Sequence, residues 1–185
     1  MWTTIGIIAV LVLYIIAVYN GLVARRTQSR EAWATIDTQL KRRYDLIPNL
    51  VETVRAAAAH EKDTLAAVVA ARNAAMTANG VADKSTAERG LTGALNKLFA
   101  LGESYPTLRA NENFLELQRE LKDTEDKIQA TRQFYNTVVL TLNAKTEMFP
   151  GNIFAKIFHF GKAQFFEMEP DEEKVARKAP TVKFD

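Results

Sequence analysis

Cysteine is absent from the 185 residues of this chain, and proline and glycine are scarce, with five and eight copies. The absence of cysteine excludes disulfide bonds, thiolate metal sites, cysteine catalysis and a lipoprotein anchor. The scarcity of proline and glycine favours long helices over many short strands. The 24 basic residues nearly balance the 22 acidic ones. This balance gives no support to nucleic-acid binding, which usually needs a concentrated basic face.

Groups that carry chemistry are also sparse, since the chain has only two histidines. His60 is followed by Glu61 as in a zinc-protease helix, but Thr64 stands where the second ligand should be. His159 lies among phenylalanines without a carboxylate beside it. The glycines form no phosphate-binding loop, and the carboxylates of residues 112–126 alternate with Arg and Lys as on a solvated helix face. The sequence therefore predicts a protein that is not an enzyme, with no cofactor and no catalytic, cofactor-binding or metal-binding residues.

The first 24 residues differ from the rest, because residues 5–24 carry no charged side chain. Twenty helical residues rise about 30 Å, which is the thickness of the bilayer hydrocarbon core. A cleaved signal peptide is the alternative, but it would have a charged start, a shorter apolar run and a small-residue cleavage site. We expect an uncleaved membrane anchor whose representative apolar residues are Ile5, Ile8, Leu11, Leu13, Ile16 and Val18. Because Arg25, Arg26 and Arg30 come after it, the N-terminus is expected outside and the remaining chain in the cytoplasm.

Residues 25–148 show helical periodicity throughout. Apolar residues from Trp33 to Tyr44 recur every three or four positions, and Pro48 is expected to begin a new helix with Asp45 as its N-cap. The second stripe comprises Val51, Val54, Ala58, Leu65, Val68 and Ala75. A third helix is expected over residues 85–104, with Leu91, Leu95, Leu98 and Leu101 on its apolar face.

The fourth helix, beginning near Asn111, has the clearest pattern. Its apolar spacing alternates three and four over four heptads, which is typical of a bundle seam or a coiled coil. The seam comprises Phe114, Leu117, Leu121, Thr124, Ile128, Thr131, Tyr135, Val138 and Leu142. Its two threonines, with Glu61 and Arg72 on the second stripe, indicate either a buried polar site or residues that set register or are partly exposed.

Residues 149–166 hold six of the ten phenylalanines, in the sequence FPGNIFAKIFHFGKAQFF. We expect a short amphipathic helix capped by Asn152 and closed by Gly161, with Lys156, His159 and Ala155 on its non-aromatic side. The aromatic side would pack on the bundle, on the membrane surface or on another protein chain. We expect packing to dominate at Phe149 and association at Phe158 and Phe160. The candidate interaction surface is Phe149, Ile153, Phe154, Ile157, Phe158, Phe160, Phe165 and Phe166.

Several motifs together resemble the LemA family, in the family's order and over nearly the whole chain. They are RRYDLIPNLVETVRAAAAHEKDTLAAVVAAR, YPTLRANENFLELQRELKDTEDKI, YNTVVLTLN, FPGNIFAKIF and the late FFE. The resemblance implies a bacterial protein with one N-terminal membrane helix, an antiparallel four-helix bundle and no established enzymatic activity. Two departures are Leu142, where the family usually has a second Tyr, and His159, where it usually has Gly.

The sequence thus predicts an all-α protein. Its expected parts are a transmembrane anchor (1–24), a four-helix bundle (25–148), the aromatic segment (149–166) and a charged flexible tail (167–185). The expected function is a scaffold or interaction protein in the bacterial inner membrane. The alternatives are a homo-oligomer that organises or shapes lipid, or an accessory subunit of a membrane protease or transporter. Membrane lipid, a second copy and a membrane protein are the expected partners.

Overall fold

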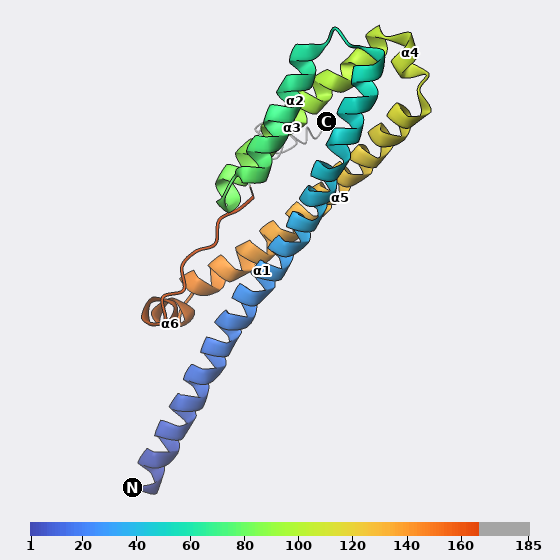
Figure 1. The fold of residues 1–185 in the computed structure, drawn as a ribbon. Helices are drawn as coiled ribbons and strands as arrows, with labels where there is room; N and C mark the ends of the chain where they lie inside the picture. Colours follow the sequence, from blue (N-terminus) through green and yellow to red (C-terminus); the bar gives the residue numbers. More distant parts are fainter. Residues whose placement is uncertain (167–185) are drawn as a thin grey trace, which may run out of the picture. The chain divides into compact units, whose positions relative to one another are not determined.

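The computed structural model describes residues 1–166, and in this part of the chain the protein is all α-helix without β-strands (Figure 1). The helices are α1 (Trp2–Ala57), α2 (Lys62–Thr77), α3 (Gly80–Ser104), α4 (Pro106–Arg109), α5 (Glu112–Glu147) and α6 (Gly151–Ile157). The prediction of a long apolar N-terminal helix followed by packed helices is confirmed. The expected tail, residues 167–185, lies outside the described residues.

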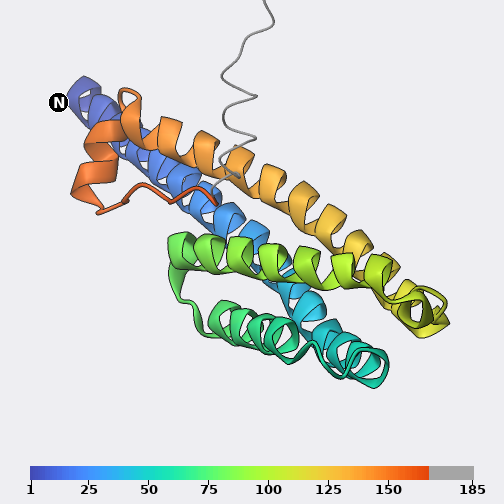
Figure 2. The ribbon, with the colours of Figure 1, turned by 90° about the horizontal axis from the view of Figure 1, so that it is seen from above.

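The chain forms two compact units. The first comprises residues 1–46 and 116–165, and the described part of the second comprises residues 47–115 and Phe166. In the first unit, α1 and α5 lie side by side (Figure 2). Their contacts include the Trp33 and Tyr135 rings, 5.4 Å apart, and the Arg43–Glu125 ion pair at 2.9 Å.

The predicted seam of α5 is confirmed. Leu121, Ile128, Val138 and Leu142 are each at most 5% exposed, and the polar seam residue Thr124 is fully buried. At the start of the helix, the Asn111 side-chain oxygen accepts a hydrogen bond from the Phe114 backbone N–H at 3.1 Å, as expected for an N-cap. Local periodicity therefore gives the correct buried face of α5.

In the second unit, α2 and α3 are neighbours, and the expected apolar face of α3 is buried at Leu91, Leu95 and Leu98. The Phe99 and Phe114 rings meet edge-on at 6.3 Å. A Cβ at Gly102 would lie 3.0 Å from the Phe114 ring, so glycine permits this close approach. The helix α3 begins at Gly80 rather than at residue 85, so residues 80–84 belong to the helix and not to the break before it.

The expected helix break at Pro48 is wrong, because α1 continues through it to Ala57. A proline inside a helix loses one hydrogen bond and costs about 3 kcal/mol. Pro48 itself is exposed, whereas Ile47, Leu50 and Val51 beside it are at most 3% exposed, and their burial offsets this local cost. Asp45 is consequently an exposed residue inside α1 and not an N-cap.

The second stripe was expected to lie on one helix, but a turn at residues 58–61 divides it between α1 and α2. The Glu61 backbone N–H donates to the Ala58 carbonyl at 3.1 Å, and the Tyr105 hydroxyl donates to the Glu61 carboxylate at 2.8 Å. This bond, followed by burial and the nearby negative charge, raises the pKa of the Tyr105 hydroxyl. A contact between residues 44 positions apart thus supports a turn within an alanine-rich sequence that favours helix.

Candidate membrane-interface site

The end of α5 passes into α6 through a turn that requires glycine. A Cβ at Gly151 would overlap the backbone carbonyl oxygen of Lys145, so any other residue would displace the main chain. Pro150 precedes it as the N-cap residue of α6. Asn152 was expected in this role but makes no capping bond, because the helix already begins at Gly151. The FPGN sequence therefore sets how closely α6 follows the end of α5.

Residues 161–165, here called the C-terminal strap, lie along α5 and are held by two of its side chains. The Asn143 amide donates to the Ala163 carbonyl at 3.0 Å and accepts from the Ala163 N–H at 2.9 Å. The Tyr135 hydroxyl donates to the Gln164 carbonyl at 2.8 Å. Burial raises the pKa of Tyr135, and a hydrogen bond with Ser29 opposes this shift. Both side chains bind backbone, so they fix the strap without depending on its side chains.

The helix α6 and the turn after it bring aromatic residues against the second half of the apolar stretch of α1. The Tyr14 ring meets Phe154 at 6.4 Å, and the Tyr19 ring meets Phe158 at 4.8 Å and Phe160 at 5.9 Å. Figure 2 shows α6 beside the N-terminal part of α1. The aromatic segment therefore lies against the apolar helix within the first unit.

A small buried cluster fixes this contact. Leu22, Ala155 and Phe160 form its core, and Val18, Val23 and Phe154 pack around it. The Arg26 guanidinium lies over the Phe160 ring, 4.7 Å from its centre, which adds a cation–π attraction. The cluster joins α1 to α6 at the place where the apolar stretch meets its first arginines.

The buried face of α6 differs from the expected one. Ala155, placed on the non-aromatic side by helical periodicity, is 4% exposed, whereas Ile153 and Ile157 are 47% and 59% exposed. A small side chain allows α6 to approach α1 closely, so alanine is the contact residue. Phe154 also packs on this contact, whereas Ile153 and Ile157 are exposed.

The turn after α6 is closed by a residue other than the expected Gly161. His159 has a φ of 56°, in the left-handed region, and the Phe160 N–H donates to the Ala155 carbonyl at 2.8 Å. Left-handed backbone costs an ordinary residue about 1–2 kcal/mol but costs glycine little. This explains why glycine would suit position 159, where the sequence departs from the usual family pattern.

The predicted interaction residues separate into two groups. Phe160 and Phe166 are buried within the chain and Phe154 is half-buried. Phe149 is 80% exposed, so the expectation that packing dominates there is wrong; it lies on the turn and not beside α5. Phe160 is 9% exposed, so the expected dominance of association at that residue has no support in its environment. The exposed group is Phe149, Ile153, Ile157, Phe158 and Phe165.

The predicted anchor residues lie on the most exposed part of α1. Ile5, Ile8, Leu11, Leu13 and Ile16 are exposed, and Val18 is half-buried against the cluster. Among the described residues, α1 is the one helix long and apolar enough to cross a membrane. Only 6% of its 18-residue apolar window is buried. The low burial distinguishes it from the core helix of a soluble protein.

A groove of about 360 Å³ lies between this helix and the turn after α5. One wall consists of Tyr14, Ala17, Val18, Gly21 and Leu22, and the other of Lys145 and residues 148–151. The Lys145 ammonium reaches α1 and lies 3.9 Å from the position of a Cβ at Gly21. Lys145 is the single charged residue among the ten that line the groove.

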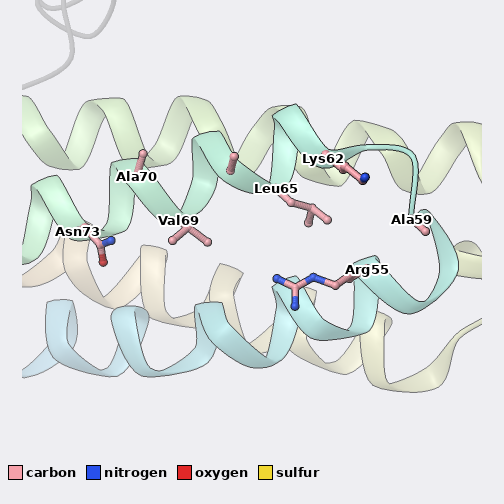
Figure 3. A pocket seen from close by; sticks show the side chains of 8 residues that line it. Arg55, Ala59, Lys62, Leu65, Val69, Ala70 and Asn73 are labelled. Atoms are coloured by element: carbon pink, nitrogen blue, oxygen red, sulfur yellow. The ribbon is translucent and has the colours of Figure 1, made fainter.

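A second groove, of about 700 Å³, lies in the second unit between the end of α1 and α2 (Figure 3). Leu65, Val69 and Ala70 give it an apolar wall, and Arg55 and Lys62 lie toward one end. Its eight lining residues include no carboxylate, histidine or hydroxyl group. This composition suits contact with another molecule rather than acid–base chemistry.

Other polar groups are explained by local structure. His60 lies exposed in the turn after α1. Thr124 and Thr131 donate to carbonyls four residues earlier, at 2.8 and 2.9 Å, so their hydroxyls are satisfied within α5. A hydrogen bond from Lys127, then its charge and that of Arg42, lower the pKa of Asp123 on the surface. Within residues 1–166, no group of three or more His, Asp or Glu side chains is placed to hold a metal ion.

Three residues of the first unit were not identified from the sequence. Asn143 hydrogen-bonds a segment 20 positions away, and Lys145 lies beside Gly21 of α1. Arg43 is a charged residue that is only 3% exposed, although charged residues surround it in the sequence. A signal existed only for Asn143, because a polar residue directly after the buried Leu142 suggests a specific bond. The other two depend on neighbours that local periodicity does not specify.

Comparison with known proteins agrees with the sequence motifs. Magnetosome protein MamQ 2 of Paramagnetospirillum magneticum is 32% identical over 84 residues, 45% of this chain and 31% of the relative. Magnetosome protein MamQ of Magnetospirillum gryphiswaldense is 30% identical over 84 residues, again 45% of this chain and 31% of the relative. The match thus spans about a third of the length of these relatives. The LemA family model matches residues 32–184, and the chain belongs to the LemA family.

Proposed function

We propose that this protein is a single-pass membrane protein that presents a helical interaction or scaffolding module at the cytoplasmic face of a bacterial inner membrane. The observation that carries the proposal is the continuity of α1 within the first unit. The same helix exposes apolar residues 5–13 and then buries Ile36 and Leu40, each at most 1% exposed. Because no loop interrupts α1 within the first unit, its exposed apolar stretch continues directly into the part that packs against α5. The LemA family is not a known enzyme family.

The depth of the anchor supports a specific arrangement at the membrane. The first aromatic contact on α1 is at Tyr14, so residues 2–13 are the part that lies clear of α6. Twelve helical residues span about 18 Å, whereas the hydrocarbon core is about 30 Å thick. A helix that crosses the bilayer therefore brings α6 and the end of α5 to the inner edge of the membrane. Ile153, Ile157 and Phe149, all exposed, then face lipid.

Single cysteines test this arrangement, because the chain has no native cysteine. In intact cells, a membrane-impermeant maleimide should label Thr3→Cys and should label Gln133→Cys, on the exposed side of α5, only after permeabilisation. The reason is the arginine cluster after the apolar stretch, which favours a cytoplasmic location for the rest of the chain. Labelling of Gln133→Cys in intact cells, or recovery of the protein in the soluble fraction, would contradict the proposal.

A lipid-organising homo-oligomer is the second candidate. It is supported by the exposed apolar side chains of α6, which lie next to the apolar helix and would contact lipid or a second copy. Native mass spectrometry of the full chain in detergent separates the candidates. A single large closed assembly supports the homo-oligomer, and a monomer that retains another protein supports an interaction protein or an accessory subunit of a protease or transporter.

A further inference from the structure

We propose that the groove between α1 and the turn after α5 binds one anionic phospholipid of the surrounding bilayer, with Lys145 contacting its phosphate. This inference rests on the proposed function, because it requires that α1 lies in a membrane. It adds a site, a ligand class and a residue role to that function.

The position of the groove indicates a ligand from the membrane. Its α1 wall runs from Tyr14 to Leu22, in the second half of the uncharged stretch that ends at residue 24. Lys145 lies near Gly21, one turn before Arg25 and Arg26. An interfacial lysine places its methylenes along apolar surface and its ammonium at the headgroups. Along α1, the apolar wall therefore comes before the ammonium, in the same order in which the acyl chain and the phosphate of a lipid follow each other from the bilayer core to its surface.

Charge at the rim favours an anionic headgroup. Within residues 1–166, the Lys145 side chain makes no hydrogen bond or ion pair, and no acidic residue lines the groove. Glu147, the nearest carboxylate along the chain, pairs with Lys162. Arg26 is engaged over the Phe160 ring. The ammonium of Lys145 is thus available to a phosphate.

The size of the groove fits a small ligand such as part of one lipid. The groove measures about 360 Å³, which falls within the usual range of small-ligand sites, about 300–1,000 Å³.

The chain provides a matched pair of variants for testing the groove. Gly21→Leu places a branched side chain in the groove, where a Cβ would make only ordinary contact with Lys145. Gly6→Leu makes the same change in the same apolar helix, at a position with nothing within 4 Å. Lys145→Gln removes the charge at similar size, and Lys145→Arg keeps it.

The experiment measures lipid retention by native mass spectrometry of the full chain in detergent, with phosphatidylglycerol and phosphatidylcholine of identical acyl chains as probes. Wild type, Gly6→Leu and Lys145→Arg should retain one phosphatidylglycerol per chain, preferred about fivefold over phosphatidylcholine, which corresponds to about 1 kcal/mol for one basic residue at an anionic headgroup. Lys145→Gln should lose the preference, and Gly21→Leu should lose retention of both lipids.

Equal preference in Lys145→Gln and wild type, or equal retention in Gly21→Leu and Gly6→Leu, would overturn the inference. Loss of a dimer in Gly21→Leu, without loss of lipid, would also overturn it and identify a second copy as the occupant. Circular dichroism melting of each variant shows whether the fold is intact. Cysteine labelling separates the lipid site from the proposed membrane topology. A chain that is inserted as proposed but shows no lipid preference contradicts the lipid site and leaves the proposed function intact.

Discussion

Replacing Phe160 with alanine should loosen the contact of α6 with α1. A buried phenylalanine removes about 150–250 Å² from water, and Phe160 is 9% exposed. Its burial therefore removes about 180 Å², which contributes about 4–5 kcal/mol at about 25 cal/mol per Å². This agrees with the cost of about 3–5 kcal/mol for changing a buried Phe to Ala. The Arg26 guanidinium over its ring adds about 0.5–1 kcal/mol.

Phe149 is the matched control in the same segment. It is 80% exposed, so the same calculation gives only about 1 kcal/mol for Phe149→Ala. The difference between the two variants reverses the order expected from the sequence.

Hydrogen–deuterium exchange of the full chain in detergent measures this difference, because it reports the free energy of local opening. Phe160→Ala should lower amide protection across residues 151–160 by about 100-fold or more, since 1.4 kcal/mol corresponds to a factor of ten. Phe149→Ala should lower it by less than about fivefold. Equal losses, or a larger loss for Phe149→Ala, would refute the assignment of Phe160 as the main packing contact.

Four further predictions concern the packing and titration of α5 and its neighbours. Leu121→Ala and Ile128→Ala should each lower the free energy of unfolding by about 2–5 kcal/mol in a denaturant titration, because both side chains are at most 5% exposed. Asn143→Ala should weaken the strap by about 1–3 kcal/mol, read from faster exchange of the Ala163 amide that it binds. His159→Gly should raise the melting temperature, because it removes about 1–2 kcal/mol of left-handed strain. Burial raises the pKa of Tyr135 above its ordinary value of 10.0. The contribution of its neutral hydroxyl to folding stability is therefore fully present below pH 10 and is lost as the pH rises through the folded pKa. Tyr135→Phe should consequently lose less stability than wild type between about pH 8 and about pH 11.

Each of these predictions has a control variant or an outcome that would contradict it. Phe134 is 55% exposed on α5, so Phe134→Ala should have little effect; a cost equal to that of Leu121→Ala would mean that the seam is misassigned. Gly161→Ala should be nearly neutral, since a Cβ there meets nothing within 4 Å and its backbone is not left-handed. Unchanged exchange at Ala163 in Asn143→Ala would exclude the amide clamp. The same alkaline loss in Tyr135→Phe would assign the titration to other groups, of which Tyr105 is one.

Sequence alone determined the features that depend on near neighbours. The uncharged stretch of residues 5–24, the buried seam of α5 and the Asn111 cap are determined by spacing and composition within one or two helical turns. The LemA resemblance also came from motifs in their order and is confirmed by the family match over residues 32–184. The roles of the membrane anchor, the interaction surface and the expected partners stay predictions.

Only the tertiary structure decided the features that depend on distant neighbours. Helical periodicity shows that α6 is amphipathic, but Ala155 of its expected non-aromatic side is buried in the cluster with Leu22 of α1, whereas Ile153 and Ile157 are exposed. Pro48 disfavours a helix by about 3 kcal/mol, yet burial of the residues around it keeps α1 continuous. Asn143 and Lys145 are ordinary polar residues in the sequence, and they acquire their roles because the chain returns beside them at Ala163 and Gly21.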